Sequence, residues 1–156
     1  MENMDTPTAL IFSRQNIMDL PAGTNYENVS KGAYEVVHEA NPDVILVASG
    51  SEVSTLDQTA QLLANDGIKA RVVSCPSEGL FRRQSKEYQE NLLPHNGKIF
   101  GLTAGLPVTF EGLVGGQGKV YGLESFGYSA PFKVLDEKLG YTPENIYKEV
   151  KAYLNK

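Results

Sequence analysis

The sequence has 156 residues, of which 41% are hydrophobic and 21% charged, and this composition is typical of a folded protein with one main core. Its 14 lysine and arginine residues and 19 aspartate and glutamate residues give a formal charge of −5, so we expect no nucleic acid as a partner. One cysteine excludes an internal disulfide, and with two histidines it cannot build a closed zinc site. No apolar run approaches the roughly 20 residues of a membrane helix, and the polar start at Met1–Thr8 is unlike a secretory signal, so we expect a cytoplasmic protein without membrane contact.

The first thirty residues predict one strand and a linker. Thr8–Ser13 is a short apolar run, which is typical of a strand. Residues 19–28 are rich in turn-forming residues and poor in apolar ones, which indicates a linker. Because no predicted helix covers this part, we expect the main domain to run from residue 31 to residue 156.

From residue 31 onward the sequence predicts alternating strands and helices. Val44–Ala48 is apolar throughout, as in a strand that is buried on both faces of a parallel sheet. Ser49 and Glu52 fit a capping box, and apolar residues at helical spacing follow until Gly67. The other predicted elements are strands over residues 34–38, 70–74, 98–103 and 119–123, and helices over residues 85–92, 107–114 and 130–139 and from residue 143 onward. The alternation predicts a three-layer α/β/α fold with a mostly parallel, mixed sheet of about five strands.

The turn after the central predicted strand is the first candidate site. Ligands bind at the carboxyl ends of strands in open parallel sheets, and backbone amides at a helix N-terminus attract anions. Ser49 and Ser51 in this turn could assist, so the sequence predicts a weak anion site there. A plain helix cap is the alternative, and it is the commoner arrangement.

No segment carries a complete catalytic or nucleotide-binding pattern. Gly115–Lys119 departs from both phosphate-loop spacings, so a loop that leads into a strand is expected instead. Cys75 is expected to be a buried structural thiol, because His38 and His95 are expected at the surface or at strand ends and not beside it. We therefore expect no catalytic residue, no cofactor-binding residue and no metal ligand in this chain.

Arg14 directly follows the predicted strand at Thr8–Ser13. An arginine at the carboxyl end of a strand can hold a phosphate through two parallel hydrogen bonds. A surface ion pair is the alternative interpretation of this residue.

Several segments resemble the C-terminal part of transketolase in both order and spacing. They are Thr6–Ile17 with its Ser-Arg-Gln-Asn, Lys31–Tyr34, Pro42–Val53 with its Gly-Ser-Glu-Val, residues 67–77, Phe126–Pro131 and Leu139–Asn145. The resemblance covers nearly the whole chain. It implies that residues 1–30 are the end of the family's middle, pyrimidine-binding domain with a linker, and that residues 31–156 are the transketolase C-terminal domain.

In this family, the full enzyme transfers a two-carbon ketol unit between sugar phosphates with thiamine diphosphate and a divalent metal, Mg or Ca. The resemblance implies that this chain is a C-terminal fragment that is inactive alone and binds neither cofactor nor metal. The missing N-terminal and middle domains would be its partners, and the full enzyme would be a homodimer. Arg14 matches the family arginine that helps to bind the sugar phosphate, so the fragment would contribute packing, dimer support and one substrate contact.

Two alternatives stay open at this point. The chain could be a stand-alone binding or assembly subunit of a split transketolase, although a start inside a strand of another domain favours a cut chain. It could also be the C-terminal part of a related thiamine enzyme such as dihydroxyacetone synthase. The Ser-Arg-Gln-Asn segment favours transketolase over deoxyxylulose-phosphate synthase but does not separate it from dihydroxyacetone synthase.

Overall fold

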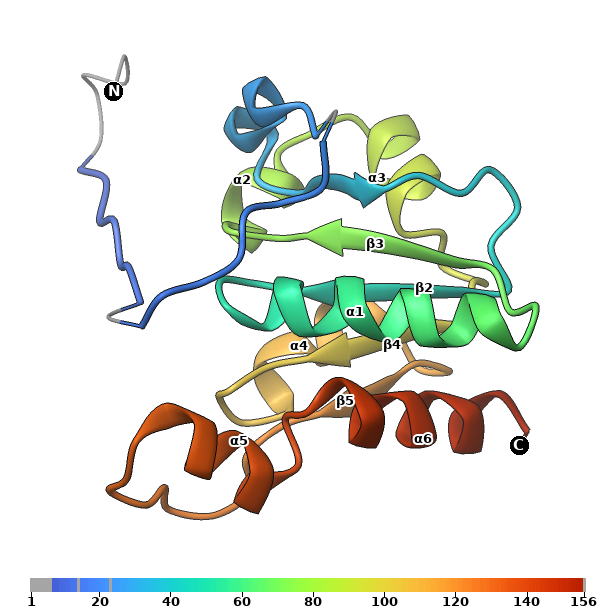
Figure 1. Ribbon diagram of the computed structural model, residues 1–156. Helices are drawn as coiled ribbons and strands as arrows, with labels where there is room; N and C mark the ends of the chain where they lie inside the picture. The colour runs from blue at the N-terminus through green and yellow to red at the C-terminus, as the bar shows by residue number, and fades with distance from the viewer. Residues whose placement is uncertain (1–6, 14, 23, 156) are drawn as a thin grey trace.

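Five strands form one mixed sheet, with helices on both faces, among residues 7–13, 15–22 and 24–155, which the computed structural model describes (Figure 1). The strands are β1 (Tyr34–Val37), β2 (Val44–Ala48), β3 (Ala70–Ser74), β4 (Ile99–Leu102) and β5 (Lys119–Tyr121). Their order in the sheet is β1-β3-β2-β4-β5. β1 runs antiparallel to β3, and the other neighbouring strands are parallel. The predicted α/β class and the predicted sheet are confirmed.

The helices form two layers, one on each face of the sheet. They are α1 (Glu52–Asn65), α2 (Glu78–Arg82), α3 (Lys86–Leu92), α4 (Val108–Val114), α5 (Phe132–Leu139) and α6 (Pro143–Leu154), and the short 3-10 helix η1 (Tyr26–Lys31) precedes β1. Side chains of α1 and α6 share one buried cluster with the sheet, and side chains of α2, α3 and α4 share a second cluster on the opposite face. Figure 1 shows α1 and α6 in front of the sheet and α4 behind it. The predicted three-layer arrangement is therefore confirmed.

The strand β2 lies at the centre of both clusters. All five of its residues are buried. Leu46 packs into the cluster of α1 and α6, whereas Ile45 and Val47 pack into the cluster of α2, α3 and α4. Successive side chains of a strand point to opposite faces, so an apolar run of this kind is stable only between two covering layers.

The helix α1 buries the apolar face that its spacing predicts. Val53, Leu56, Ala60 and Leu63 are all buried against the sheet and α6. The helix ends at Asn65, and Gly67 follows with a φ of 75°, a left-handed backbone that suits glycine at a helix C-terminus. This part of the prediction is confirmed.

The start of α1 differs from the predicted capping box. Ser51, and not Ser49, occupies the N-cap position, and its side chain makes no cap hydrogen bond. Gly50 has a φ of 65°, which turns the chain between β2 and α1 and moves the helix start two residues on from the expected cap. The Ser51 hydroxyl donates instead to Oε1 of Glu52 at 2.8 Å.

The C-terminal helix α6 follows its predicted cap. The Thr142 hydroxyl accepts from the backbone N–H of Asn145 at 3.3 Å, and Pro143 occupies the first helical position. Ile146 and Val150 are fully buried in the cluster shared with α1. These contacts hold the last helix of the chain against the same face of the sheet as α1.

The prediction of a strand at Thr8–Ser13 is wrong, because the structure has no strand at these residues. Leu10, Ile11 and Phe12 are 59%, 94% and 80% exposed. A strand needs a neighbouring strand to take its backbone hydrogen bonds, and these residues extend beside the sheet without one (Figure 1). Leu20, later in the chain, packs against the cluster of α1 and α6, and the domain boundary after residue 30 stays a prediction.

The helix α2 was missed by the sequence analysis. It has five residues, which is too few for a helical period to show. Its signal is local, because the Ser77 hydroxyl accepts from the backbone N–H of Leu80 at 3.4 Å as an N-cap. Phe81 is the residue of α2 that is buried in the second cluster.

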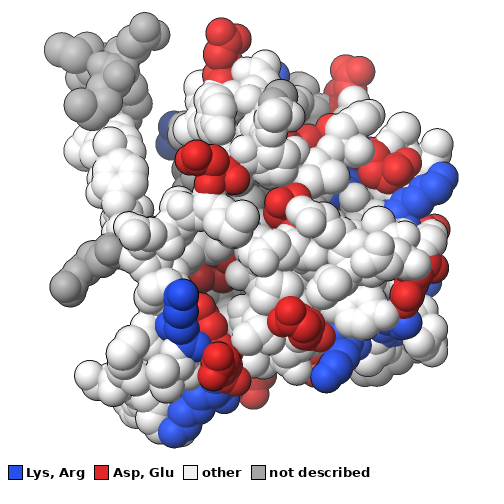
Figure 2. Space-filling model, viewed as in Figure 1, with Lys and Arg blue, Asp and Glu red and all other residues white. Residues whose placement is uncertain are grey.

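The surface mixes charges of both signs. On the face seen in Figure 2, basic and acidic side chains are interspersed over the helices and loops. Across the described residues, no helix combines the length and the apolar character that crossing a bilayer would require.

We expect the substitution Leu63→Ala to lower the free energy of unfolding by about 2–5 kcal/mol, because Leu63 is fully buried and its truncation leaves a cavity. Denaturant unfolding followed by circular dichroism measures this loss. The matched control is Leu106→Ala, which removes the same atoms from a residue that is 57% exposed and should cost less than about 1 kcal/mol. Equal losses for the two variants would contradict the packing of α1 described above.

Candidate functional site

The candidate site lies at the edge of the sheet where the parallel strands end. Ser49 follows β2, Cys75 follows β3 and Thr103 follows β4. Because parallel strands end at the same edge, the turns after them are brought together there. This edge is therefore the first candidate for a ligand site in this chain.

The structure places both predicted anion-site serines at the start of α1. Ser49 and Ser51 flank Gly50 in the turn between β2 and the helix. The Ser51 hydroxyl already donates to the Glu52 carboxylate, which lies in the first turn of α1. An anion bound at this end would therefore compete with Glu52 for that hydroxyl and for the helix N-terminus. The anion site at Ser49 and Ser51 stays a prediction.

Glu52 is a partly buried carboxyl group at this edge. Burial raises the pKa of its carboxyl above the ordinary value of 4.5, and the hydrogen bond from Ser51 opposes part of this rise. The nearby charge of Asp136 adds to the rise. The pKa of Asp136 is itself raised by burial. Two carboxyl groups thus approach this edge from α1 and from α5.

Tyr141 closes the site from the side of α6, and the sequence analysis missed it. Its hydroxyl donates to the backbone carbonyl of Thr103 at 2.8 Å, and its ring packs edge-on against Tyr121 with centroids 5.5 Å apart. Burial, with smaller effects of Tyr121 and Glu52, raises the pKa of Tyr141 to about 12. The residue therefore anchors the turn before α6 to the end of β4 and is protonated near neutral pH. Its place next to Gly140, in a motif that resembles transketolase, was the available signal.

Cys75 is a buried structural thiol, as the sequence predicts. Burial, and then the charge of Glu78, raise the pKa of Cys75 to about 12. The two described histidines are exposed and are bound elsewhere. Nδ1 of His38 lies 2.6 Å from Glu35, and Nδ1 of His95 lies 2.9 Å from Glu90. Neither arrangement activates the thiol as a nucleophile.

The remaining predicted features lie away from this edge. Arg14, the predicted phosphate ligand, is outside the described residues. The segment Gly115–Lys119 leads from α4 into β5, which begins at Lys119. It therefore lies at the amino ends of the parallel strands, at the other end of the sheet from the candidate site. The described residues contain no group of three histidine, cysteine, aspartate or glutamate side chains that could hold a metal ion.

We expect Glu52→Gln to stabilise the chain increasingly as the pH rises from about 4 to 7. The folded state binds the Glu52 proton more tightly than the unfolded state does, so stability falls as the pH rises from the unfolded pKa through the folded pKa. Glutamine removes that loss, and the difference between the two proteins should vanish below the ordinary pKa of 4.5. Melting temperatures across this pH range test it.

Glu144→Gln is the control for this experiment. Glu144 is an exposed glutamate that also lies in the first turn of a helix. A gain from Glu52→Gln that does not depend on pH, or that Glu144→Gln reproduces, would show that burial of the Glu52 carboxylate is not its cause.

The family comparison and the curated relatives agree. The family model for the transketolase-like TK C-terminal domain matches residues 32–142. The transketolase of Staphylococcus aureus is 40% identical over 154 residues, which cover 96% of this chain and 23% of that protein. Transketolase 1 of Pasteurella multocida is 39% identical over 160 residues, which cover 99% of this chain and 24% of that protein. The chain thus spans only 23–24% of the length of these relatives.

Solved structures give the same result. A mutant transketolase from Pichia stipitis matches with a TM-score of 0.84 and 32% identity over 91% of this chain and 20% of that one. The transketolase of Campylobacter jejuni matches with a TM-score of 0.73 and 30% identity over 90% of this chain and 20% of that one. The resemblance seen in the sequence is confirmed, and the chain belongs to the family of transketolase C-terminal domains.

Proposed function

We propose that this chain serves as the C-terminal part of a transketolase that transfers a two-carbon ketol unit between sugar phosphates. The observation that carries the proposal is the 40% identity to a transketolase over 96% of the chain. One matched structure from Pichia stipitis is a transketolase in complex with sedoheptulose 7-phosphate, which supports a sugar phosphate as the substrate class.

The catalytic cofactor belongs, in this proposal, to the parts of the enzyme that this chain lacks. Thiamine diphosphate would supply the carbanion chemistry, and a divalent metal would hold its diphosphate. The described residues offer no cluster of metal ligands, and Cys75 and Tyr141 have pKa values of about 12. We infer that the chain is inactive alone and contributes packing, support of a homodimer in the cytoplasm, and a contact to the substrate phosphate.

Exposed apolar side chains support the packing role. Ile11 and Phe12 in the N-terminal segment are 94% and 80% exposed, and Phe126 after β5 is 98% exposed. In Figure 1 the N-terminal segment and the turn before α5 lie toward the same end of the sheet. Large apolar side chains that are exposed at one end of a sheet are typical of a surface that another part of the protein covers. We assign this end to the contact with the middle domain.

The test is a chimera of the Staphylococcus aureus transketolase in which this chain replaces the matching C-terminal segment. We expect the chimera to transfer the ketol unit from xylulose 5-phosphate to ribose 5-phosphate, and the isolated chain to show no turnover. The truncated enzyme without any C-terminal segment is the control. Activity of the isolated chain, or an inactive but folded chimera, would contradict the proposal. A preference for formaldehyde as acceptor in the natural full-length protein would favour a dihydroxyacetone synthase instead.

A second prediction concerns Arg14, which aligns with the arginine of the family's Ser-Arg-Gln-Asn segment. In the active chimera, we expect Arg14→Ala to lower kcat/KM for xylulose 5-phosphate by about 10- to 100-fold, the loss expected for a charge-assisted hydrogen bond. Unphosphorylated xylulose should lose far less. Arg83→Ala, at an exposed arginine in the C-terminal domain, is the control. An equal loss for both donors would show that Arg14 does not contact the phosphate.

A further inference from the structure

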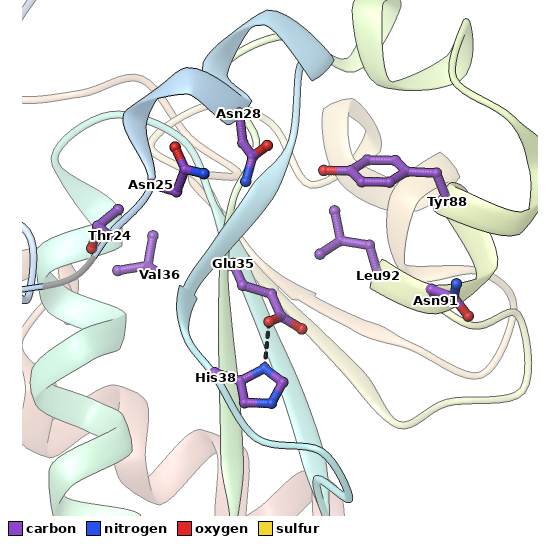
Figure 3. Close-up of a pocket in the computed structure, with 9 residues that line it drawn as sticks. All are labelled: Thr24, Asn25, Asn28, Glu35, Val36, His38, Tyr88, Asn91 and Leu92. Carbon is purple, nitrogen blue, oxygen red and sulfur yellow. Dashed lines mark hydrogen bonds and ion pairs between the residues drawn. The ribbon is translucent and has the colours of Figure 1, made fainter.

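A hollow of about 350 Å³ with a mixed polar and apolar lining lies along the free edge of β1, apart from the site at the strand ends. Three segments converge on it: the stretch around η1, the strand β1 and the helix α3 (Figure 3). The side chains that matter for its chemistry are those of Asn28, Glu35, His38, Tyr88 and Leu92. A volume of this size is at the lower end of the range for small-molecule sites.

The backbone of β1 leaves hydrogen-bonding groups free beside the hollow. β1 is an edge strand that pairs with β3 alone among the described strands. Within the described chain, the backbone groups of Tyr34–Val37 make no hydrogen bond outside that pairing. The N–H and C=O groups on the outer side of an edge strand therefore remain available to a ligand or to water.

The carboxylate at the base of the hollow is fixed and balanced in charge. Glu35 Oε1 lies 3.0 Å from Nε of Arg71, and Oε2 lies 2.6 Å from Nδ1 of His38. Arg71 is 8% exposed, and its guanidinium also donates to the backbone carbonyls of Glu39 and Asn91, each at 2.8 Å. The Arg71 guanidinium is thus held by protein groups and does not line the hollow. Nε2 of His38 makes no hydrogen bond to any described residue and can bond to a ligand.

The opposite wall offers an amide, a phenol and an apolar surface. Figure 3 shows the Asn28 amide and the Tyr88 hydroxyl directed toward the same space, with Leu92 below them. The Tyr88 hydroxyl donates to the carbonyl of Ala33 at 2.8 Å, so its oxygen can still accept a hydrogen bond. The Asn28 side chain has no hydrogen bond to any described residue. Lys31 places its ammonium over the Tyr88 ring, 4.9 Å from its centre, and does not line the hollow.

We propose that this hollow binds a neutral polyhydroxylated molecule of monosaccharide size. Hydroxyl groups both donate and accept, and they match the mixed set of amide, imidazole, carboxylate and strand-edge groups. The absence of a free cation among the described lining residues disfavours a phosphorylated ligand. β1 is only four residues long and has a bulge between Glu35 and Val37, features that obstruct the addition of a peptide as a further strand.

The test is a titration of the isotope-labelled 156-residue chain with D-ribose, followed by proton–nitrogen correlation spectra. We expect saturable shifts confined to the backbone amides around Asn28, Glu35 and Leu92. Ribose 5-phosphate should bind no more tightly than ribose. The experiment needs no catalysis, so its outcome is independent of the proposed transketolase function.

Variants make the test specific to the hollow. We expect Asn28→Ala to weaken ribose binding about fivefold or more, because the amide donor is lost. Asn28→Asp keeps the size of the side chain but also removes the amide donor, so we expect a similar loss. Asn65→Ala, at an exposed asparagine at the end of α1, is the control and should leave binding unchanged. Three results would overturn the proposal: no saturable shift, tighter binding of ribose 5-phosphate, or shifts at these amides with a short alternating Thr-Val peptide but not with ribose.

Discussion

The burial of β2 on both faces is the constraint from which the architecture follows. Five consecutive apolar residues cannot be covered from one side, so α1 and α6 are needed on one face and α2, α3 and α4 on the other. With β2 in the middle, β3 and β4 become its parallel neighbours, and β1 and β5 are left as the edges. One candidate site lies at the carboxyl end of this central strand, and the other lies beside the edge strand β1. The start of α1 and the turn before α6 lie at the carboxyl end of β2, whereas β1 pairs only with β3 among the described strands.

The polar groups at the carboxyl end of the strands bond to other groups of the protein. The Tyr141 hydroxyl, the Thr103 carbonyl and the Ser51 hydroxyl each have a partner within the protein. Burial keeps Tyr141 protonated and resists the ionisation of Glu52. These groups therefore hold the turns after β2 and β4 in place.

The sequence was informative where a signal is local and uninformative where it depends on the fold. The burial of Val53, Leu56 and Leu63 follows from helical spacing alone, and the cap of α6 follows from Thr142 and Pro143. The start of α1 was misplaced because Gly50 adopts a left-handed turn that no spacing reveals. The partner of Tyr141 is 38 positions away in the chain, and Arg71 and Glu35 meet only because β3 lies beside β1. The order of short motifs, and not any one of them, carried the resemblance to transketolase.

The edge strand β1 and the segment Thr8–Ser13 differ in how their unpaired backbone groups are protected. β1 has one partner strand, and its short length and its bulge discourage another strand from joining its open side. Thr8–Ser13 has the composition of a strand but pairs with no strand among the described residues, and its apolar side chains Leu10, Ile11 and Phe12 are exposed. A strand-forming sequence that is neither paired nor blunted costs solubility unless another part of the protein covers it. The proposal that Thr8–Ser13 completes the middle domain of a transketolase explains this exposure, because the segment would then gain its partner strand and its cover in the same contact.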